Sequence, residues 1–340
     1  MFWDVTTSIF ELLIGVGVFL LAIVMLSQLF GKPSDQLNRL FQKIGNNRFA
    51  NMGLGIGMVG ITQSSGPTTV IIISLVGGGV LSLLQATGLV MGVNIGSSLT
   101  SLMFVFTTFR IRYFIMFLVF IGATIRLITK QERMITIANA CISFGLLFIG
   151  MGMMGSALSS NVIIVDFFTG VFSSITSPIL LFIIGTLFAA MIQSSSAAIG
   201  ISVAMVGSGL LPFESAIFIV IGANLGTSFI AIIASLPNNI DARRVGLFHV
   251  LFNSLGSLLF LMVMLPFHSI LVPWYQGIIH TPVIQMSVFH VVFNIVTMLV
   301  LIPFIKSLNR LVCWIIKDKT LENQEESKLL TTNNIYVQNA

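Results

Sequence analysis

Two clusters of glutamine, serine and threonine residues, 130 positions apart, are the parts of the chain best suited to hold a polar ligand. The first cluster consists of Gln63, Ser64, Ser65, Thr68 and Thr69. The second consists of Gln193, Ser194, Ser195 and Ser196. Serine is a favoured N-cap residue, and Pro67 suits the first turn of a helix. We therefore expect a broken helix that restarts just after each cluster, with free backbone N–H groups beside the hydroxyls.

A helix N-terminus of this kind binds an anion without any Lys or Arg, because it carries roughly half a positive charge and unpaired donors. Carbonyl oxygens freed where the helix unwinds, with serine and threonine hydroxyls, suit a hard cation such as sodium. No ionisable residue lies between Arg48 and Arg110. Since a neutral, low-dielectric site leaves an anion uncompensated, we expect cations to travel with it.

A second polar signature begins 31 residues after each glutamine, reading NIGSS at 94–98 and NLGTS at 224–228. Its candidate ligands are Asn94, Ser98, Asn224, Thr227 and Ser228. We expect these side chains to complete the polar shell, while Gly96 and Gly226 let another backbone approach closely. Hydrogen bonding between helices, without ligand contact, is the alternative role for the two asparagines.

The two regions are copies of one segment. A gapless comparison of residues 63–101 with residues 193–231 gives 14 identities in 39 positions. The identities include Gln, Ser, Asn and Gly residues at fixed spacing within apolar surroundings, which composition alone seldom produces. A duplication at this spacing indicates one structural unit used twice.

Composition places these units in a lipid bilayer. Of the 340 residues, 56% are hydrophobic and only 8% are charged, with a mean hydropathy of +1.04, which excludes an ordinary water-soluble domain. The net charge of +5 reports lysines and arginines gathered on one side of the membrane and does not indicate a nucleic-acid partner. The two cysteines, Cys141 and Cys313, are interpreted as packing residues.

Nine apolar runs are candidates for membrane helices, so we expect an all-α, multi-pass protein of the cell (plasma or inner) membrane. The runs lie near 9–30, 50–76, 80–108, 113–128, 134–155, 178–206, 210–236, 245–266 and 284–305. The first is interpreted as a retained helix and not as a signal peptide, because no Lys or Arg precedes it and no small-residue cleavage site follows.

The basic residues predict the orientation of the helices. If 31–48, 126–133, 241–244 and all residues from 306 onward are cytoplasmic, 14 of the 16 basic residues lie inside, leaving only Arg110 and Arg112 outside. The two repeats then cross the membrane in opposite directions. This is the inverted-repeat plan of secondary transporters, in which broken or re-entrant helices meet at the bilayer midplane.

We expect six segments along the chain. They are an N-terminal transmembrane helix with a cytoplasmic amphipathic segment (1–48), repeat 1 (49–133), a connecting transmembrane helix with an external loop (134–177), repeat 2 (178–266), a C-terminal transmembrane helix (267–316) and a disordered cytoplasmic tail (317–340).

The paired motifs resemble the type II sodium-phosphate cotransporter family, in particular its prokaryotic branch without a C-terminal cytoplasmic helical domain. The resemblance covers roughly 49–305 and includes FHVLFN at 248–253 and FHVVFN at 289–294. It implies symport of inorganic phosphate with sodium into the cell by alternating access, with sodium bound through Gln63, Ser65, Gln193 and Ser195. Repeat 1 departs from the pattern at Gly66, which supplies no fourth hydroxyl.

Other readings remain open at this point. A transporter of another small oxyanion would use the same neutral groups, and a membrane sensor derived from a transporter would share the fold. A channel needs a pore lined throughout by polar residues, and an enzyme needs a nucleophile beside a base; neither pattern is present in the sequence. We expect no enzymatic activity and no cofactor apart from sodium as the coupling ion. Structural hydrogen bonds are expected for His249 and His290.

Overall fold

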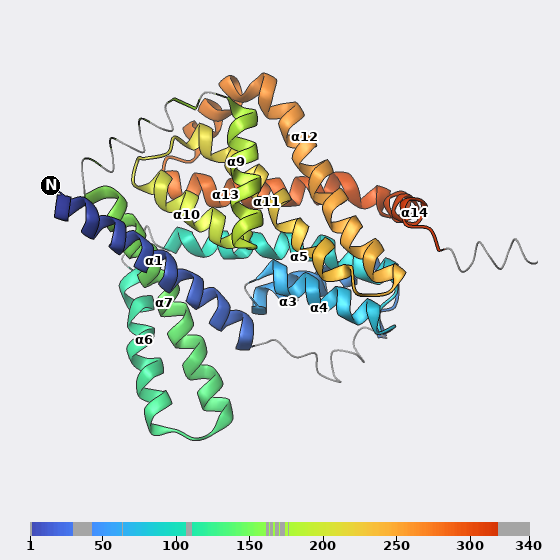
Figure 1. Cartoon of the computed structure of the whole chain (residues 1–340), viewed down its shortest axis with the longest axis horizontal. Helices are drawn as coiled ribbons and strands as arrows, with labels where there is room; N and C mark the ends of the chain where they lie inside the picture. The colour runs from blue at the N-terminus through green and yellow to red at the C-terminus, as the bar shows by residue number, and fades with distance from the viewer. Residues whose placement is uncertain are drawn as a thin grey trace, which may run out of the picture.

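The computed structural model describes residues 2–29, 43–62, 64–106, 111–160 and 177–318, and single positions between 161 and 176. Every regular element in these parts of the chain is helical (Figure 1). The helices are α1 (Phe2–Leu29), α3 (Arg48–Thr62), α4 (Ser65–Gly77), α5 (Leu83–Val105), α6 (Ile111–Ile128), α7 (Glu132–Ser160), α9 (Pro178–Ile192), α10 (Ser195–Gly207), α11 (Phe213–Ser235), α12 (Ile240–Ile278), α13 (Pro282–Leu301), the 3-10 turn η2 (Ile302–Phe304) and α14 (Ile305–Ile315). Gln63, Arg110 and residues 319–340 lie outside the described residues.

The chain is a multi-pass helical membrane protein. Five helices among the described residues are long and apolar enough to cross a bilayer: α5, α7, α11, α12 and α13 together with its continuation. The short helices α4 and α10 have 13 residues each. At a rise of about 1.5 Å per residue each spans only about 20 Å, less than a hydrocarbon core of about 30 Å.

Two helix triplets have the same bounds shifted by 130 residues. Adding 130 to the first and last residues of α3, α4 and α5 gives those of α9, α10 and α11. A glycine with positive φ lies two residues after the end of each short helix, namely Gly79 at 72° and Gly209 at 75°. The duplication found in the sequence therefore extends to the structure, while the opposite directions of the two repeats in the membrane stay a prediction.

Glycines allow close packing within each triplet. A Cβ at Gly92 of α5 would overlap the Met52 carbonyl oxygen of α3, and a Cβ at Gly222 of α11 would overlap the Phe182 carbonyl oxygen of α9. Close approach through small residues is a common way for helices to associate in lipid, where apolar surface gives no hydrophobic driving force. The same offset of 130 relates the two contacts, so both repeats use one packing solution.

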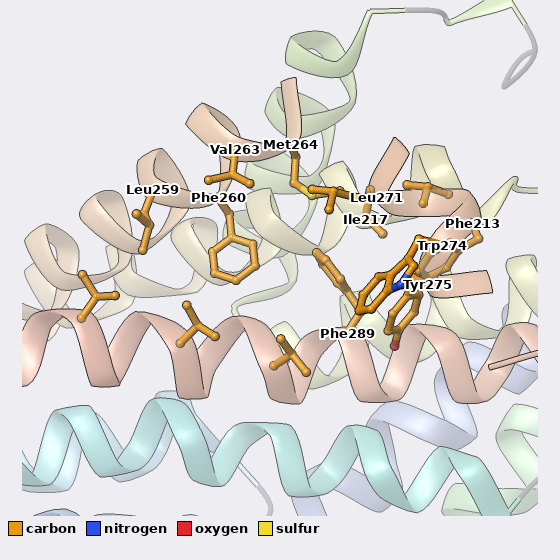
Figure 2. Close-up of a pocket in the computed structure, with 14 residues that line it drawn as sticks. Phe213, Ile217, Leu259, Phe260, Val263, Met264, Leu271, Trp274, Tyr275 and Phe289 are labelled. Atoms are coloured by element: carbon orange, nitrogen blue, oxygen red, sulfur yellow. The ribbon is translucent and has the colours of Figure 1, made fainter. Parts of the chain in front are cut away.

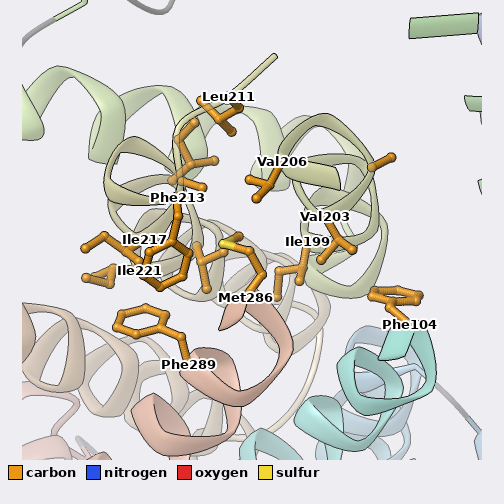
Figure 3. Packing of buried hydrophobic residues seen from close by; sticks show 14 of the residues in the cluster. Phe104, Ile199, Val203, Val206, Leu211, Phe213, Ile217, Ile221, Met286 and Phe289 are labelled. Atoms are coloured by element: carbon orange, nitrogen blue, oxygen red, sulfur yellow. The ribbon is translucent and has the colours of Figure 1, made fainter. Parts of the chain in front are cut away.

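A separate layer of α1, α6 and α7 flanks the repeats. Helix α7 packs against α1, α6 and α10, and Figure 1 shows the α6–α7 hairpin projecting away from the other helices. Phe19 of α1 lies 6.0 Å from Phe104 of α5 between ring centroids and fills the space beside Gly200 of α10. Figure 3 shows the apolar core that surrounds α10, with Ile199 and Val203 turned towards it. This core holds α10 in place.

Helix α12 extends beyond the apolar run at 245–266 that the sequence indicated. It continues through Pro266 and Pro273 to Ile278, for a total of 39 residues. Proline removes one backbone hydrogen bond and bends a helix, which membrane helices tolerate when neighbours cover the freed groups. Figure 1 shows α12 curving over the top of the repeats.

Candidate functional site

The two short helices meet at their first residues. The hydroxyl oxygens of Ser65 and Ser195 lie 3.4 Å apart, although the residues are 130 positions apart in sequence. Both side chains are buried. Helix α4 packs against α5 of its own repeat and α11 of the other, and α10 packs against α11 and α5 in the same way. The two helix N-termini therefore come together between the long helices of both repeats.

The two N-termini differ in their caps. Ser194 has extended backbone angles, and its hydroxyl accepts a hydrogen bond from the Ala197 amide at 3.2 Å. Ser64 has nearly the same backbone angles, but its side chain accepts no capping hydrogen bond. Because Pro67 occupies the position of Ala197 and has no N–H, this cap is chemically impossible in repeat 1. The two repeats therefore present different N-termini at the junction.

Hydroxyl groups close to Ser64 form a small network in repeat 1. The Thr68 hydroxyl donates to the Ser64 carbonyl oxygen at 2.6 Å, and the hydroxyls of Thr62 and Thr68 are 2.7 Å apart. Thr69 differs from its neighbour, because its fully buried hydroxyl has no hydrogen-bond partner among the described residues. A buried hydroxyl without a partner costs free energy, which makes Thr69 a candidate ligand.

Backbone atoms also line the meeting point. The Gln193 carbonyl oxygen would lie 3.3 Å from a Cβ built on Gly66, so glycine permits this approach. Gln193 has a left-handed backbone with φ of 57° at the C-terminal cap of α9, and its side chain is exposed. The Gln193 carbonyl of repeat 2 therefore contacts the N-terminus of α4 in repeat 1. Gln63, the corresponding glutamine of repeat 1, lies outside the described residues.

The second polar signature lies inside α5 and α11, where most of its side chains bond to helix backbone or to a neighbouring helix. Asn94 donates to the Val90 carbonyl at 3.1 Å. Thr227 donates to the Asn224 carbonyl at 3.1 Å, and Ser228 donates to a carbonyl of its own helix. The Asn224 side-chain amide nitrogen, in contrast, is buried and has no partner among the described residues.

The motifs FHVLFN (248–253) and FHVVFN (289–294) attach α12 and α13 to the long helices of the repeats. Asn253 donates to the Asn224 carbonyl at 3.1 Å, and Asn294 donates to the Ser98 hydroxyl at 2.9 Å. The His290 Nδ1 and the Ser101 hydroxyl share a hydrogen bond of 2.6 Å. The structural hydrogen bond expected for His290 is therefore confirmed, whereas the buried Nδ1 of His249 has no hydrogen-bond partner among the described residues.

Sequence reasoning missed two polar residues of this region. Thr62 bonds to Thr68, but its counterpart in repeat 2 is Ile192, so the comparison of repeats did not single it out. Ser101 bonds to His290, and its counterpart is Ala231. Thr62 directly precedes the first polar cluster and Ser101 lies three residues after the signature at 94–98, so their closeness to these motifs was the available signal.

The groups that the structure describes at the junction of α4 and α10 are hydroxyls and backbone carbonyls. No ionisable residue occurs in α4, α5 or α10, and no group of three His, Cys, Asp or Glu side chains suited to a metal ion occurs in the described parts of the chain. Oxygen ligands of this type fit a hard, weakly bound cation and do not fit a transition metal. Helix N-termini supply the complementary positive potential for an anion.

A large cavity lies elsewhere and has a different chemistry. It has a volume of about 310 Å³ and lies between α11, α12 and α13. Figure 2 shows the apolar side chains that line it, such as Phe260, Val263 and Phe289. The Tyr275 hydroxyl at its edge donates to the Gln285 carbonyl at 2.8 Å. A phosphate ion would lose its hydration there without gaining hydrogen bonds, so this cavity is not the anion site.

Comparison with known proteins identifies the family. The family model described as Na+/Pi-cotransporter matches residues 18–156 and 163–265. A protein of Escherichia coli (strain K12), named "Putative inorganic phosphate export protein YjbB", is 33% identical over 271 residues, which cover 78% of this chain and 48% of that protein. The comparison with solved structures finds no match.

Two further relatives are similar over different lengths. "Uncharacterized protein YqeW" of Bacillus subtilis (strain 168) is 28% identical over 269 residues, or 78% of this chain and 84% of that protein. "Sodium-dependent phosphate transport protein 2A" of Oryctolagus cuniculus is 39% identical over 93 residues, or 26% of this chain and 14% of that protein. The chain spans about half the length of the YjbB relatives that it matches. The match of the family model to most of the chain shows that this protein belongs to the Na+/Pi-cotransporter family.

Proposed function

We propose that the protein transports inorganic phosphate across the membrane together with sodium ions by alternating access. The observation that carries this proposal is the meeting of two helix N-termini at Ser65 and Ser195, inside a membrane protein of the Na+/Pi-cotransporter family. Phosphate oxygens are suitable acceptors for the free N–H groups and hydroxyls at such a junction. An enzyme would need a nucleophile with a neighbouring base, and these serines have none close in sequence.

Sodium is needed because the site is neutral. A phosphate ion with one or two negative charges, taken from water into a site without Lys or Arg, loses much of its hydration energy. Helix N-termini compensate part of this loss, and bound sodium ions compensate the remainder. We infer that sodium ligands come from carbonyl oxygens at the two helix breaks and from hydroxyls of Ser65 and Ser195, with the Gln63 and Gln193 side chains as further candidates.

The hydrogen bonds of the apo site suggest a division of roles. Ser65, Ser195, Thr69 and the Asn224 amide are the groups we assign to phosphate and sodium, because the two serine hydroxyls bond to each other across the junction and the other two groups have no partner among the described residues. The hydroxyls of Thr68 and Ser98 bond to a neighbouring helix instead, and those of Thr227 and Ser228 bond to carbonyls of their own helix. Asn94, whose amide bonds to its own helix, is assigned to the frame of the site, while Ser64, Ser194 and Ser196 remain candidate ligands beside the N-termini.

Uptake is the direction we propose, since a symporter driven by an inward sodium gradient carries phosphate into the cell. Export is the second candidate, and the name of the Escherichia coli relative favours it. A carrier that alternates between two open states moves its substrate along the combined gradient of substrate and ion. The direction therefore depends on the coupling ion as much as on the protein.

Transport assays with the full chain test both points. We expect purified protein in liposomes to accumulate radiolabelled phosphate with an inward sodium gradient and to lose this accumulation when choline replaces sodium. Arsenate and sulfate as competitors test other oxyanions, and a membrane sensor would bind phosphate without moving it. Net phosphate loss from preloaded cells, with no sodium-driven uptake, would establish export and refute the direction proposed here.

A further inference from the structure

Helix α14 lies across the end of the membrane helix that precedes it. Helix α13 ends at Leu301, and the turn η2, which contains Pro303, separates it from α14. Figure 1 shows α13 along its length and α14 almost end-on, so the chain changes direction between the two helices. A helix with Lys and Arg on its polar face and apolar side chains on the other lies along the membrane surface.

The side chains of α14 fall into three rows. Ile305, Leu308 and Val312 are buried against the rest of the protein. With about 100° of rotation per residue, Leu311 and Ile315 extend one edge of this buried stripe, yet they are 39% and 48% exposed. Lys306, Arg310 and Trp314 occur at every fourth position on the outer side, and all three are exposed.

Other basic residues gather at the ends of the helix. Arg244 donates through Nε to the Ile316 carbonyl at 3.0 Å, and Arg48 donates through Nη1 to the Ile302 carbonyl at 3.3 Å. Asp241 pairs with Arg244 at 2.8 Å. Among the described residues, neither Lys306 nor Arg310 forms an ion pair, although Arg310 lies 3.4 Å from the Ser307 hydroxyl. This end of the molecule carries an excess of positive charge.

We propose that α14 is a binding surface for the headgroups of anionic phospholipids. In this arrangement Leu311 and Ile315 face the acyl chains, Trp314 lies at the level of the headgroups, and Lys306 and Arg310 contact lipid phosphates. Tryptophan prefers this interfacial position, and long basic side chains reach from a helix to the headgroups. Clustered Lys and Arg residues beside a membrane helix are the usual signature for anionic lipid.

The exposed apolar side chains Leu311, Ile315 and Trp314 distinguish a lipid from a free phosphate ion as the partner. A dissolved anion gains nothing from exposed leucine, isoleucine and tryptophan side chains, whereas a phospholipid satisfies the apolar and basic rows together. The surface is separate from the junction of Ser65 and Ser195, because α14 packs on α5, α12 and η2 and no contact with α4 or α10 is among its main ones. The inference depends on membrane insertion and is independent of phosphate transport.

Two substitutions test the basic row. Each basic side chain near an anionic membrane surface contributes roughly 1 kcal/mol, or about 5-fold in affinity. We expect K306Q and R310Q each to weaken binding of phosphatidylglycerol to the purified full chain about 5-fold, and the double variant about 30-fold. Native mass spectrometry of retained lipid measures this, and K306R with R310K should restore binding.

A matched control removes the same charge elsewhere. Lys130 and Arg133 are exposed at the α6–α7 turn, so K130Q with R133Q changes the net charge equally but leaves α14 intact. We expect this control to keep wild-type lipid binding. An equal loss in the control would mean that overall charge governs binding, and unchanged binding in the α14 double variant would also overturn the proposal.

Fluorescence tests whether Trp314 contacts lipid and whether the phosphate group bound at α14 belongs to a lipid or to a free ion. The chain has three tryptophans, so replacing Trp3 and Trp274 by Phe leaves Trp314 as the reporter. We expect brominated phospholipids to quench its emission, and inorganic phosphate to displace no phosphatidylglycerol. Absence of quenching would show that α14 does not contact lipid, and displacement by free phosphate would identify a soluble anion as its ligand.

Discussion

The neighbouring residues Thr68 and Thr69 provide the sharpest test of the candidate site. Both are fully buried in the first turns of α4. The Thr68 hydroxyl donates to the Ser64 carbonyl and bonds to Thr62, whereas the Thr69 hydroxyl has no partner among the described residues. Replacing each threonine by valine keeps a β-branched side chain and removes one hydroxyl, so the two variants differ only in what that hydroxyl contacts.

The two variants should change different free energies. Thr68→Val loses two hydrogen bonds of about 0.5–1.5 kcal/mol each, so we expect the free energy of unfolding to fall by about 1–3 kcal/mol. Thr69→Val loses no hydrogen bond within the described parts of the chain and removes a buried polar group that is unpaired there, so stability should stay equal or rise. If Thr69 bonds to the bound anion, its loss should weaken phosphate binding by about 1.5–3 kcal/mol, or roughly 10- to 150-fold.

Two measurements on the same purified protein separate these effects. Thermal unfolding in detergent without phosphate reports stability, and calorimetric titration with phosphate in sodium buffer reports affinity. We expect Thr69→Val to unfold at or above the wild-type temperature while its dissociation constant rises. Wild-type affinity in Thr69→Val would remove this residue from the site, and a large loss of stability would mean that its hydroxyl supports the fold.

Three further predictions address the site, the packing and the coupling. Ser65→Ala and Ser195→Ala should each weaken phosphate or sodium binding about 10- to 150-fold. Ser202→Ala removes a hydroxyl that bonds within helix α10 and should keep wild-type affinity, so equal effects of all three variants would show a packing role. Gly92→Ala should lower the free energy of unfolding by about 1–3 kcal/mol or more, because its Cβ overlaps a carbonyl. Gly57→Ala places its Cβ in open space and should not lower the free energy of unfolding, which thermal unfolding measures for both variants. Sodium and phosphate should raise each other's affinity by the same factor, so calorimetry that finds equal phosphate binding in choline and in sodium would contradict charge balance by bound cations.

The asymmetry between the two repeats is the property of the site that these experiments address most directly. Repeat 1 has Pro67 and two threonines at positions where repeat 2 has Ala197, Ala198 and Ile199. The structure converts this difference into two kinds of N-terminus, one capped by Ser194 and one supported by Thr68. Repeat 1 is therefore expected to bind phosphate and sodium through two hydroxyls, those of Ser65 and Thr69, and repeat 2 through the Ser195 hydroxyl and the Asn224 amide.

Local features of the sequence determined the class of protein, the duplication and the presence of the helix breaks. Membrane insertion follows from hydropathy, which is a sum over neighbouring residues. The presence of the breaks follows from the serines, since serine favours the position just before a helix, but α4 and α10 begin at Ser65 and Ser195, inside the clusters and not just after them as expected. These properties depend on short stretches of chain, so no knowledge of distant contacts was needed.

Tertiary structure decided which polar groups remain available to a ligand. Thr68 and Thr69 are indistinguishable by type and spacing, but only Thr68 finds partners at Thr62 and Ser64. Ser98 resembles a ligand in sequence, yet Asn294, 196 positions away, bonds to its hydroxyl. Local sequence likewise does not predict that α12 continues beyond Pro266, because neighbouring helices determine whether a proline ends a membrane helix. A hydroxyl binds whichever group the fold brings to it, and that group is often distant in the sequence.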